Sequence, residues 1–134
     1  MMELKRWKEH LGAELNLEPK FFPANDTTAN LMAVTAGLDG LDVAPLSLAI
    51  MRKCWVEERD IAQDTVLVEA ANQCKLDGEA LLAKSREDRA QEGFDANTEE
   101  ASKRQVFGAP TYIYKDEVFW GQDRLDFLER ALAD

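Results

Sequence analysis

The sequence predicts an α/β fold in which a large all-helical block precedes a C-terminal strand–strand–helix end. Apolar residues recur at helical spacing through most of residues 27–107. After Gly108 the period changes to the alternation of two short strands. The chain has 134 residues, which is one domain by length and enough to bury roughly two-thirds of its unfolded surface.

The N-terminal region is predicted to hold one short helix and one extended segment. Residues 3–11 form an amphipathic pattern with an apolar face made of Leu4, Trp7 and Leu11. His10 lies in the last turn and is interpreted as a surface residue rather than a catalyst. Residues 15–23 carry two prolines, which restrict them to an extended edge segment.

Four helices are predicted in a helical insertion at residues 27–93. The first helix follows cap residues at 25–28, and the second runs over about 45–58. The third runs over 64–75, and the fourth begins after a turn at 76–79. Their predicted inward residues are Leu31, Val34 and Leu38; Leu46, Ile50, Met51 and Cys54; Val66, Val68, Ala70 and Ala71; and Leu81 and Leu82. The charged run 84–104 is interpreted as a solvated helix face, and Asn97–Glu100 as a capping box.

The C-terminal part, residues 94–134, is predicted as a helix, a hairpin and a final helix. The hairpin strands are 111–114 and 118–120, and the last helix runs over 123–133. Its predicted inward residues are Leu125, Leu128 and Leu132. The Ala109–Pro110 bond, where the chain enters the hairpin, is expected to be cis.

Composition excludes several classes of function. The net charge of −10 and the pI near 4.6 argue against nucleic acid or an anionic membrane as a partner. The start has no signal-peptide core and no run reaches transmembrane length, so a cytoplasmic location is expected. Cys54 and Cys74 are interpreted as small buried hydrophobes, because no C-x-x-C and no metal-ligand cluster is present.

Two short motifs point to a ligand. Residues 106–111 read Val-Phe-Gly-Ala-Pro-Thr, and residues 119–124 read Phe-Trp-Gly-Gln-Asp-Arg. A peptide can pair with the main chain beside such a proline, and a helix that begins after the hairpin offers free N–H groups to a carboxylate. The plainer alternatives are an ordinary trans turn at Ala109 and helix capping by Gln122 or Asp123.

These motifs, together with Asn97–Ala101 and the rest of 119–132, resemble the C-terminal end of the 2-hydroxychromene-2-carboxylate isomerases. Residues 54–61 and 76–82 resemble the helical insert of the same family, so the resemblance covers nearly the whole chain. It implies a partial thioredoxin-like fold, related to kappa-class glutathione transferases and to disulfide-forming oxidoreductases.

The resemblance implies glutathione as cofactor and a small aromatic or chromene-type carboxylate as substrate. The glutathione thiol would add to the substrate, permit cis/trans isomerisation about a carbon–carbon bond, and leave. Ala109 would bind the cysteinyl part of glutathione, Gln122 and Asp123 its γ-glutamyl end, and Pro110 would set the geometry. The predicted pocket wall is Phe107 and Trp120.

The family also has a strand–helix–strand part before its equivalent of residues 1–7, and the first helix of that part carries the reactive serine. No residue here matches that serine, so we expect no catalytic residue in this chain and no activity from this chain alone. The strand 111–114 would then have an unpaired edge, which predicts a homodimer or other self-association. The alternatives are a kappa-type transferase, a thiol–disulfide oxidoreductase relative, and an inactive fragment acting as an interaction module.

Overall fold

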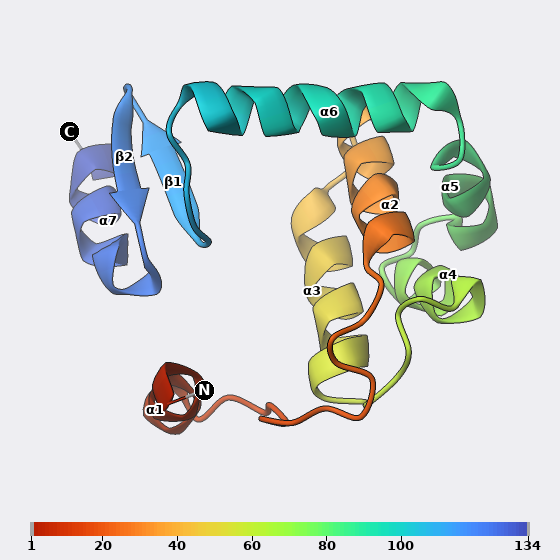
Figure 1. The fold of residues 1–134 in the computed structure, drawn as a ribbon, viewed down its shortest axis with the longest axis horizontal. Helices are drawn as coiled ribbons and strands as arrows, with labels where there is room; N and C mark the ends of the chain where they lie inside the picture. Colours follow the sequence, from red (N-terminus) through yellow and green to blue (C-terminus); the bar gives the residue numbers. More distant parts are fainter. Residues whose placement is uncertain (1, 134) are drawn as a thin grey trace. The chain divides into compact units, whose positions relative to one another are not determined.

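The computed structural model describes residues 2–133 and divides the chain into two compact units, Met1–Asp95 and Ala96–Asp134. Helix α6 (Asp88–Lys103) is continuous across the boundary between them (Figure 1). The predicted capping box at Asn97–Glu100 is therefore wrong, because the helix begins nine residues before Asn97. Glu100 instead pairs with Arg104 one turn later. Residues 15–23, predicted as an extended edge segment, form turns and irregular backbone with no strand.

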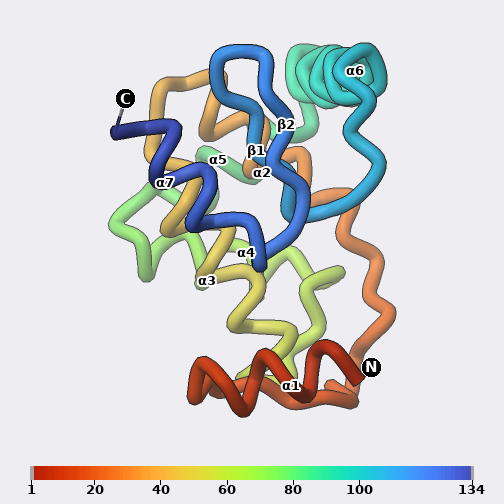
Figure 2. The backbone as a smooth tube through the Cα atoms, turned by 90° about the vertical axis from the view of Figure 1, so that its left-hand side faces the viewer, coloured from red at the N-terminus to blue at the C-terminus, as the bar shows by residue number. Residues whose placement is uncertain are grey.

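The first unit is helical, as predicted. Its helices before α6 are α1 (Met2–Leu11), α2 (Thr27–Leu38), α3 (Val43–Trp55), α4 (Asp64–Gln73) and α5 (Gly78–Lys84). Helices α2 to α5 lie close together (Figures 1 and 2). Their buried side chains form one apolar core. The side chains of Met32, Leu46 and Leu67 are fully buried there. Helix α1 contributes no buried residue.

The buried face of α2 differs from the prediction. The residues it buries are Ala29, Met32, Thr35 and Ala36. Leu31 and Val34 are half-buried and Leu38 is exposed. Helix α2 is apolar on most of its sides, so the spacing of its apolar residues does not determine which face turns inward.

Helix α3 buries Lys53, whereas the sequence analysis predicted that Met51 would face inward. Met51 is exposed, whereas the side chain of Lys53 is 1% exposed. Its ammonium lies 2.7 Å from a carboxylate oxygen of Glu57 and 2.7 Å from one of Glu69. Burial disfavours the charge, but the hydrogen bonds to both carboxylates outweigh it and raise the pKa of Lys53.

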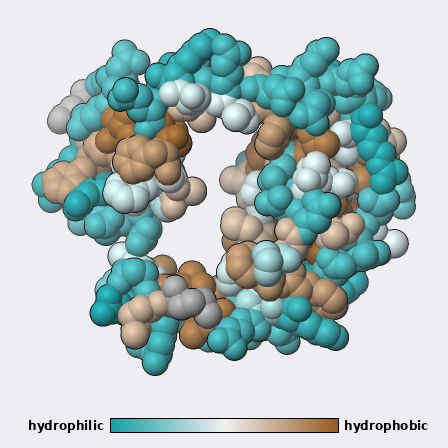
Figure 3. All heavy atoms as spheres, viewed as in Figure 1, coloured by the Kyte–Doolittle hydropathy of each residue, from teal (hydrophilic) through white to brown (hydrophobic). Residues whose placement is uncertain are grey.

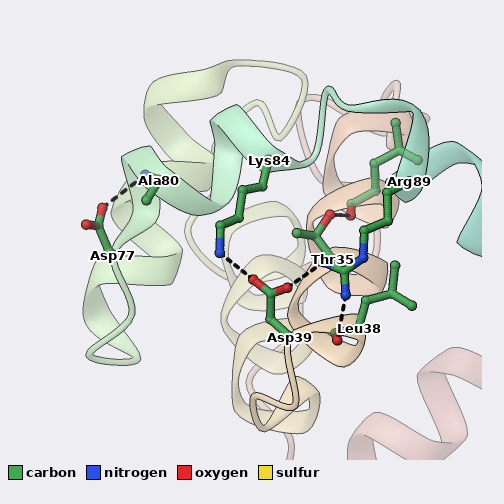
Figure 4. Close-up of polar contacts among 8 residues, drawn as sticks. Thr35, Leu38, Asp39, Asp77, Ala80, Lys84 and Arg89 are labelled. Atoms are coloured by element: carbon green, nitrogen blue, oxygen red, sulfur yellow. Dashed lines mark hydrogen bonds and ion pairs between the residues drawn. The ribbon is translucent and has the colours of Figure 1, made fainter.

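Asp39, directly after α2, joins three helices through ion pairs (Figure 4). Its carboxylate accepts from Lys84 of α5 at 2.6 Å and from Arg89 of α6 at 2.7 Å. Arg89 also donates to the carbonyl oxygen of Leu38 over 2.8 Å. The hydrogen bond from Lys84, followed by that from Arg89, lowers the pKa of Asp39. These contacts offset the unfavourable interaction between the Asp39 carboxylate and the negative end of the α2 dipole.

The second unit confirms the predicted hairpin. Strands β1 (Thr111–Tyr114) and β2 (Glu117–Trp120) pair antiparallel, with Thr111 opposite Trp120. The two-residue turn has positive φ at Lys115 and Asp116. A short 3₁₀ helix η1 (Gln122–Arg124) leads into α7 (Leu125–Ala133).

The predicted inward leucines of α7 are the main error in this unit. Leu125 and Leu132 are exposed, and Leu128 is half-buried. Among the described residues of this unit, Phe119 of β2 is the one buried large apolar side chain. Two short strands are too narrow to cover the whole apolar face of a helix, so that face stays accessible.

Candidate functional site

The two predicted motifs meet at the open end of the hairpin. The Ala109–Pro110 peptide bond is cis. The half-buried Pro110 accepts a hydrogen bond at its carbonyl oxygen from the N–H of Gly121 over 2.9 Å. Thr111 donates its hydroxyl to the carbonyl of Gly108. Residues 108–111 and 120–122 are therefore held side by side, although the hairpin separates them in sequence.

A hollow of about 240 Å³ lies at this junction. It is lined by Ala109, Trp120, Gly121, Gln122, Asp123 and Arg124. Ala109, Gln122 and Asp123, which the sequence singled out as ligand contacts, thus share one site with the predicted wall residue Trp120. Phe107 packs on Trp120 with 4.8 Å between ring centroids, but it is 74% exposed and lies outside the lining of this hollow.

Two glycines make room for the functional side chains. Gly121 has φ 108° and ψ 148°, and a Cβ there would lie 2.5 Å from Oδ1 of Asp123. A Cβ at Gly108 would lie 2.6 Å from Nε1 of Trp120. The Asp123 carboxylate and the Trp120 indole therefore lie directly against glycine backbone. The sequence prediction did not assign this role to either glycine, although both occur within the motifs.

The polar groups of the hollow are available to a ligand. Within residues 2–133, neither the N–H nor the C=O of Ala109 makes a hydrogen bond. Gly121 is the N-cap residue of η1 and no side chain caps it, so Asp123 does not serve as that cap. Asp123 is half-exposed, and its Oδ2 is 3.7 Å from Nη1 of Arg124. The arrangement offers a main-chain pair and a carboxylate, which suits a peptide with a free amino group.

The cysteines and the remaining titratable side chains of residues 2–133 lie outside this hollow. In the described part of the chain, no cluster of three or more His, Cys, Asp or Glu side chains could hold a metal ion. Cys54 is buried and Cys74 half-buried, both as free thiols, and burial followed by the charge of Asp60 raises the pKa of Cys54. Among residues 2–133, no helix has the length and apolar character needed to cross a membrane.

Comparison with known proteins gives consistent matches. Residues 1–133 match the family described as the DSBA-like thioredoxin domain. A 2-hydroxychromene-2-carboxylate isomerase of Sphingobium xenophagum is 31% identical over 135 residues, covering 100% of this chain and 67% of the relative. A protein of the same name from Pseudomonas putida is 32% identical over 136 residues, covering 98% of this chain and 63% of that one.

A solved structure shows the same similarity. The selenomethionine form of a 2-hydroxychromene-2-carboxylate isomerase matches with a TM-score of 0.78 and 28% sequence identity. The match covers 98% of this chain and 63% of that chain. The chain therefore spans about two-thirds of the length of the proteins that it matches.

Proposed function

Because this chain belongs to the DSBA-like thioredoxin domain family, and within it to the 2-hydroxychromene-2-carboxylate isomerase family, we propose that it serves glutathione-dependent isomerisation of a chromene-type aromatic carboxylate. The observation that carries the proposal is the hollow shared by Ala109, Gln122 and Asp123. A ligand that touches all three needs a peptide main chain and a charged end close together. Glutathione has both.

Each group of the hollow has a separate task in this proposal. The N–H and C=O of Ala109 pair with the main chain of the cysteinyl residue, because they have no partner among the described residues. The Asp123 carboxylate attracts the γ-glutamyl ammonium, and the Gln122 amide donates to the γ-glutamyl carboxylate. When bound, glutathione supplies the thiol that adds to the substrate and leaves after rotation about a carbon–carbon bond.

A dithiol oxidoreductase fits less well. Such an enzyme needs two thiols within bonding distance and one with a lowered pKa. Cys54 is buried in α3 with a raised pKa, and Cys74 follows α4. The described residues thus favour thiol chemistry that comes from the ligand.

A titration of glutathione into ¹⁵N-labelled protein tests this proposal. We expect saturable NMR shift changes at the amides of Ala109, Gln122 and Asp123. Asp123→Ala should weaken binding by about 1–3 kcal/mol, since one charge-assisted partner is lost. Asp126→Ala removes a carboxylate three residues away that lies outside the hollow, and it should change the affinity less than twofold. Equal losses in the two variants would contradict the assignment.

We also propose that the protein self-associates through β1. The described sheet has the order β1–β2, so the outer edge of β1 has no strand beside it, and an open edge is a template for pairing with another chain. Sedimentation should show association that increases with protein concentration. A species that remains monomeric at all concentrations would rule this out.

A further inference from the structure

A second hollow adjoins the candidate site within the hairpin and α7 unit. Its volume is about 390 Å³. It is lined by Glu117, Val118, Phe119, Trp120, Arg124 and Phe127. Trp120 and Arg124 also line the first hollow, so these two side chains form part of the wall of both.

Three aromatic side chains, Phe119, Trp120 and Phe127, line the second hollow together with the charged Glu117 and Arg124. Trp120 of β2 is 52% exposed and Phe127 of α7 is 51% exposed, while Val118 beside them is also accessible. Figure 3 shows hydrophobic residues at the surface of this unit. Such rings gain from contact with another aromatic ring, which would remove their faces from water.

The charges of this hollow favour an anion at one end. The Arg124 guanidinium is half-exposed, and its carboxylate neighbour, Asp123, is 3.7 Å away, which is longer than a hydrogen bond. Its donors can therefore take a carboxylate, with the fork geometry that suits one. Glu117 is at the opposite end of β2 from Trp120, roughly 10 Å away by strand geometry, and it would repel a carboxylate toward Arg124.

We infer that this second hollow binds the aromatic ring of the substrate and that Arg124 selects its carboxylate. The inference rests on the function proposed above, and it adds the residue that determines specificity. It also couples the two hollows. When the γ-glutamyl ammonium takes the Asp123 carboxylate, Arg124 loses its neighbouring anion and its attraction for the substrate carboxylate increases.

The experiment compares 2-naphthoate with neutral 2-naphthamide as probes, titrated into the full chain by NMR. We expect the protein to bind naphthoate at least fivefold more tightly than naphthamide. Arg124→Gln should abolish this preference and leave naphthamide binding within twofold. Phe127→Ala should weaken the binding of both probes, because it removes an aromatic side chain from the lining of the second hollow. Lys115→Gln removes one positive charge from the hairpin turn, outside both hollows, and should preserve the preference.

The same variants separate this inference from the proposed function. Asp123→Ala should weaken glutathione binding, and because it removes the anion beside Arg124 it should retain or increase the naphthoate preference of the ligand-free protein. A protein that fails to bind glutathione but shows the Arg124-dependent preference would refute the proposed function alone. Loss of glutathione binding in Arg124→Gln with naphthoate unchanged would assign Arg124 to the first hollow and overturn the inference. Equal effects of Arg124→Gln and Lys115→Gln would also overturn it, because they would indicate general charge attraction.

Discussion

Gly121 donates its backbone N–H to the carbonyl oxygen of Pro110 over 2.9 Å, and this bond joins the two segments of the candidate site. The φ of 108° at Gly121 is one that side-chain-bearing residues rarely adopt. The same residue lies against the carboxylate of Asp123. The conformation of Gly121 therefore determines both how the two segments of the hollow meet and where the Asp123 carboxylate lies.

Replacing Gly121 by alanine should destabilise the fold and displace Asp123. We expect a loss of about 1–3 kcal/mol in the free energy of unfolding, the range for a backbone held in a region that favours glycine. Glutathione binding should weaken as well. Urea denaturation measures the first effect. Gly37→Ala is the control, because its Cβ would lie 3.4 Å from Val43 and alanine favours a helix. Equal destabilisation by both changes would contradict this role for Gly121.

Substitutions at Lys53 should distinguish packing from charge. Lys53→Ala removes a buried stem and should cost about 2–4 kcal/mol of unfolding free energy. Lys53→Met keeps most of the volume and should cost less than about 1.5 kcal/mol, because Glu57 and Glu69 are accessible enough to become hydrated. Urea denaturation of both variants checks this. A methionine variant as unstable as the alanine variant would show that the ion pairs dominate.

The ion pairs of Asp39 should give the fold an acid-sensitive contribution. The hydrogen bonds from Lys84 and Arg89 lower the pKa of Asp39 in the folded protein. Its contribution to stability is therefore present above the unfolded pKa of about 3.9 and is lost as the pH falls through the lower folded pKa. The stability difference between the unsubstituted protein and Asp39→Asn should be constant above about pH 5 and shrink in more acidic solution. A difference that does not vary with pH would exclude this linkage.

The two cysteines should differ in reactivity. Burial raises the pKa of the Cys54 thiol, so both access and thiolate fraction are low. Cys74 is half-buried and should react first with iodoacetamide at pH 8. Cys54 should be labelled only at the rate at which the protein unfolds. Peptide mapping by mass spectrometry would show the order, and similar rates in the native protein would contradict it.

Local pattern was enough to predict the hairpin and the approximate bounds of most helices. The alternation after Gly108 specifies β1 and β2 without help from the rest of the chain. The predicted turn, residues 115–117, is one residue longer than the observed one, because Glu117 begins β2. Adjacency of Ala109 and Asp123 then follows, because a hairpin brings its two flanking segments together. The buried face of α2 and the burial of Lys53 depend on partners distant in sequence. Glu69 is 16 residues from Lys53 in the sequence. The spacing of residues within α3 therefore could not predict this ion pair.

The remaining errors have separate physical causes. Cap-forming residues at 97–100 do not start a helix when the preceding turn is already helical, so α6 continues through them. The leucines of α7 have the spacing of a buried face, but spacing does not show whether a surface is present to cover it. Arg124 is the last residue of the second motif, but the sequence gave no reason to assign it a ligand contact, because its place in the lining of two hollows depends on the fold.

The hydrogen bonds of Asn16 close a much longer loop of the chain than the β1–β2 turn does. Asn16 donates its backbone N–H to Trp55 over 2.7 Å and its side-chain amide to Val56, 40 residues away. The β1–β2 turn closes over two residues. Enclosing a twentyfold longer loop costs about 2.6 kcal/mol more in chain entropy, and hairpins form in about 1–10 μs. The hairpin should therefore form early and residues 12–24 dock late, and a protease added during refolding should cut residues 12–24 more readily than the hairpin.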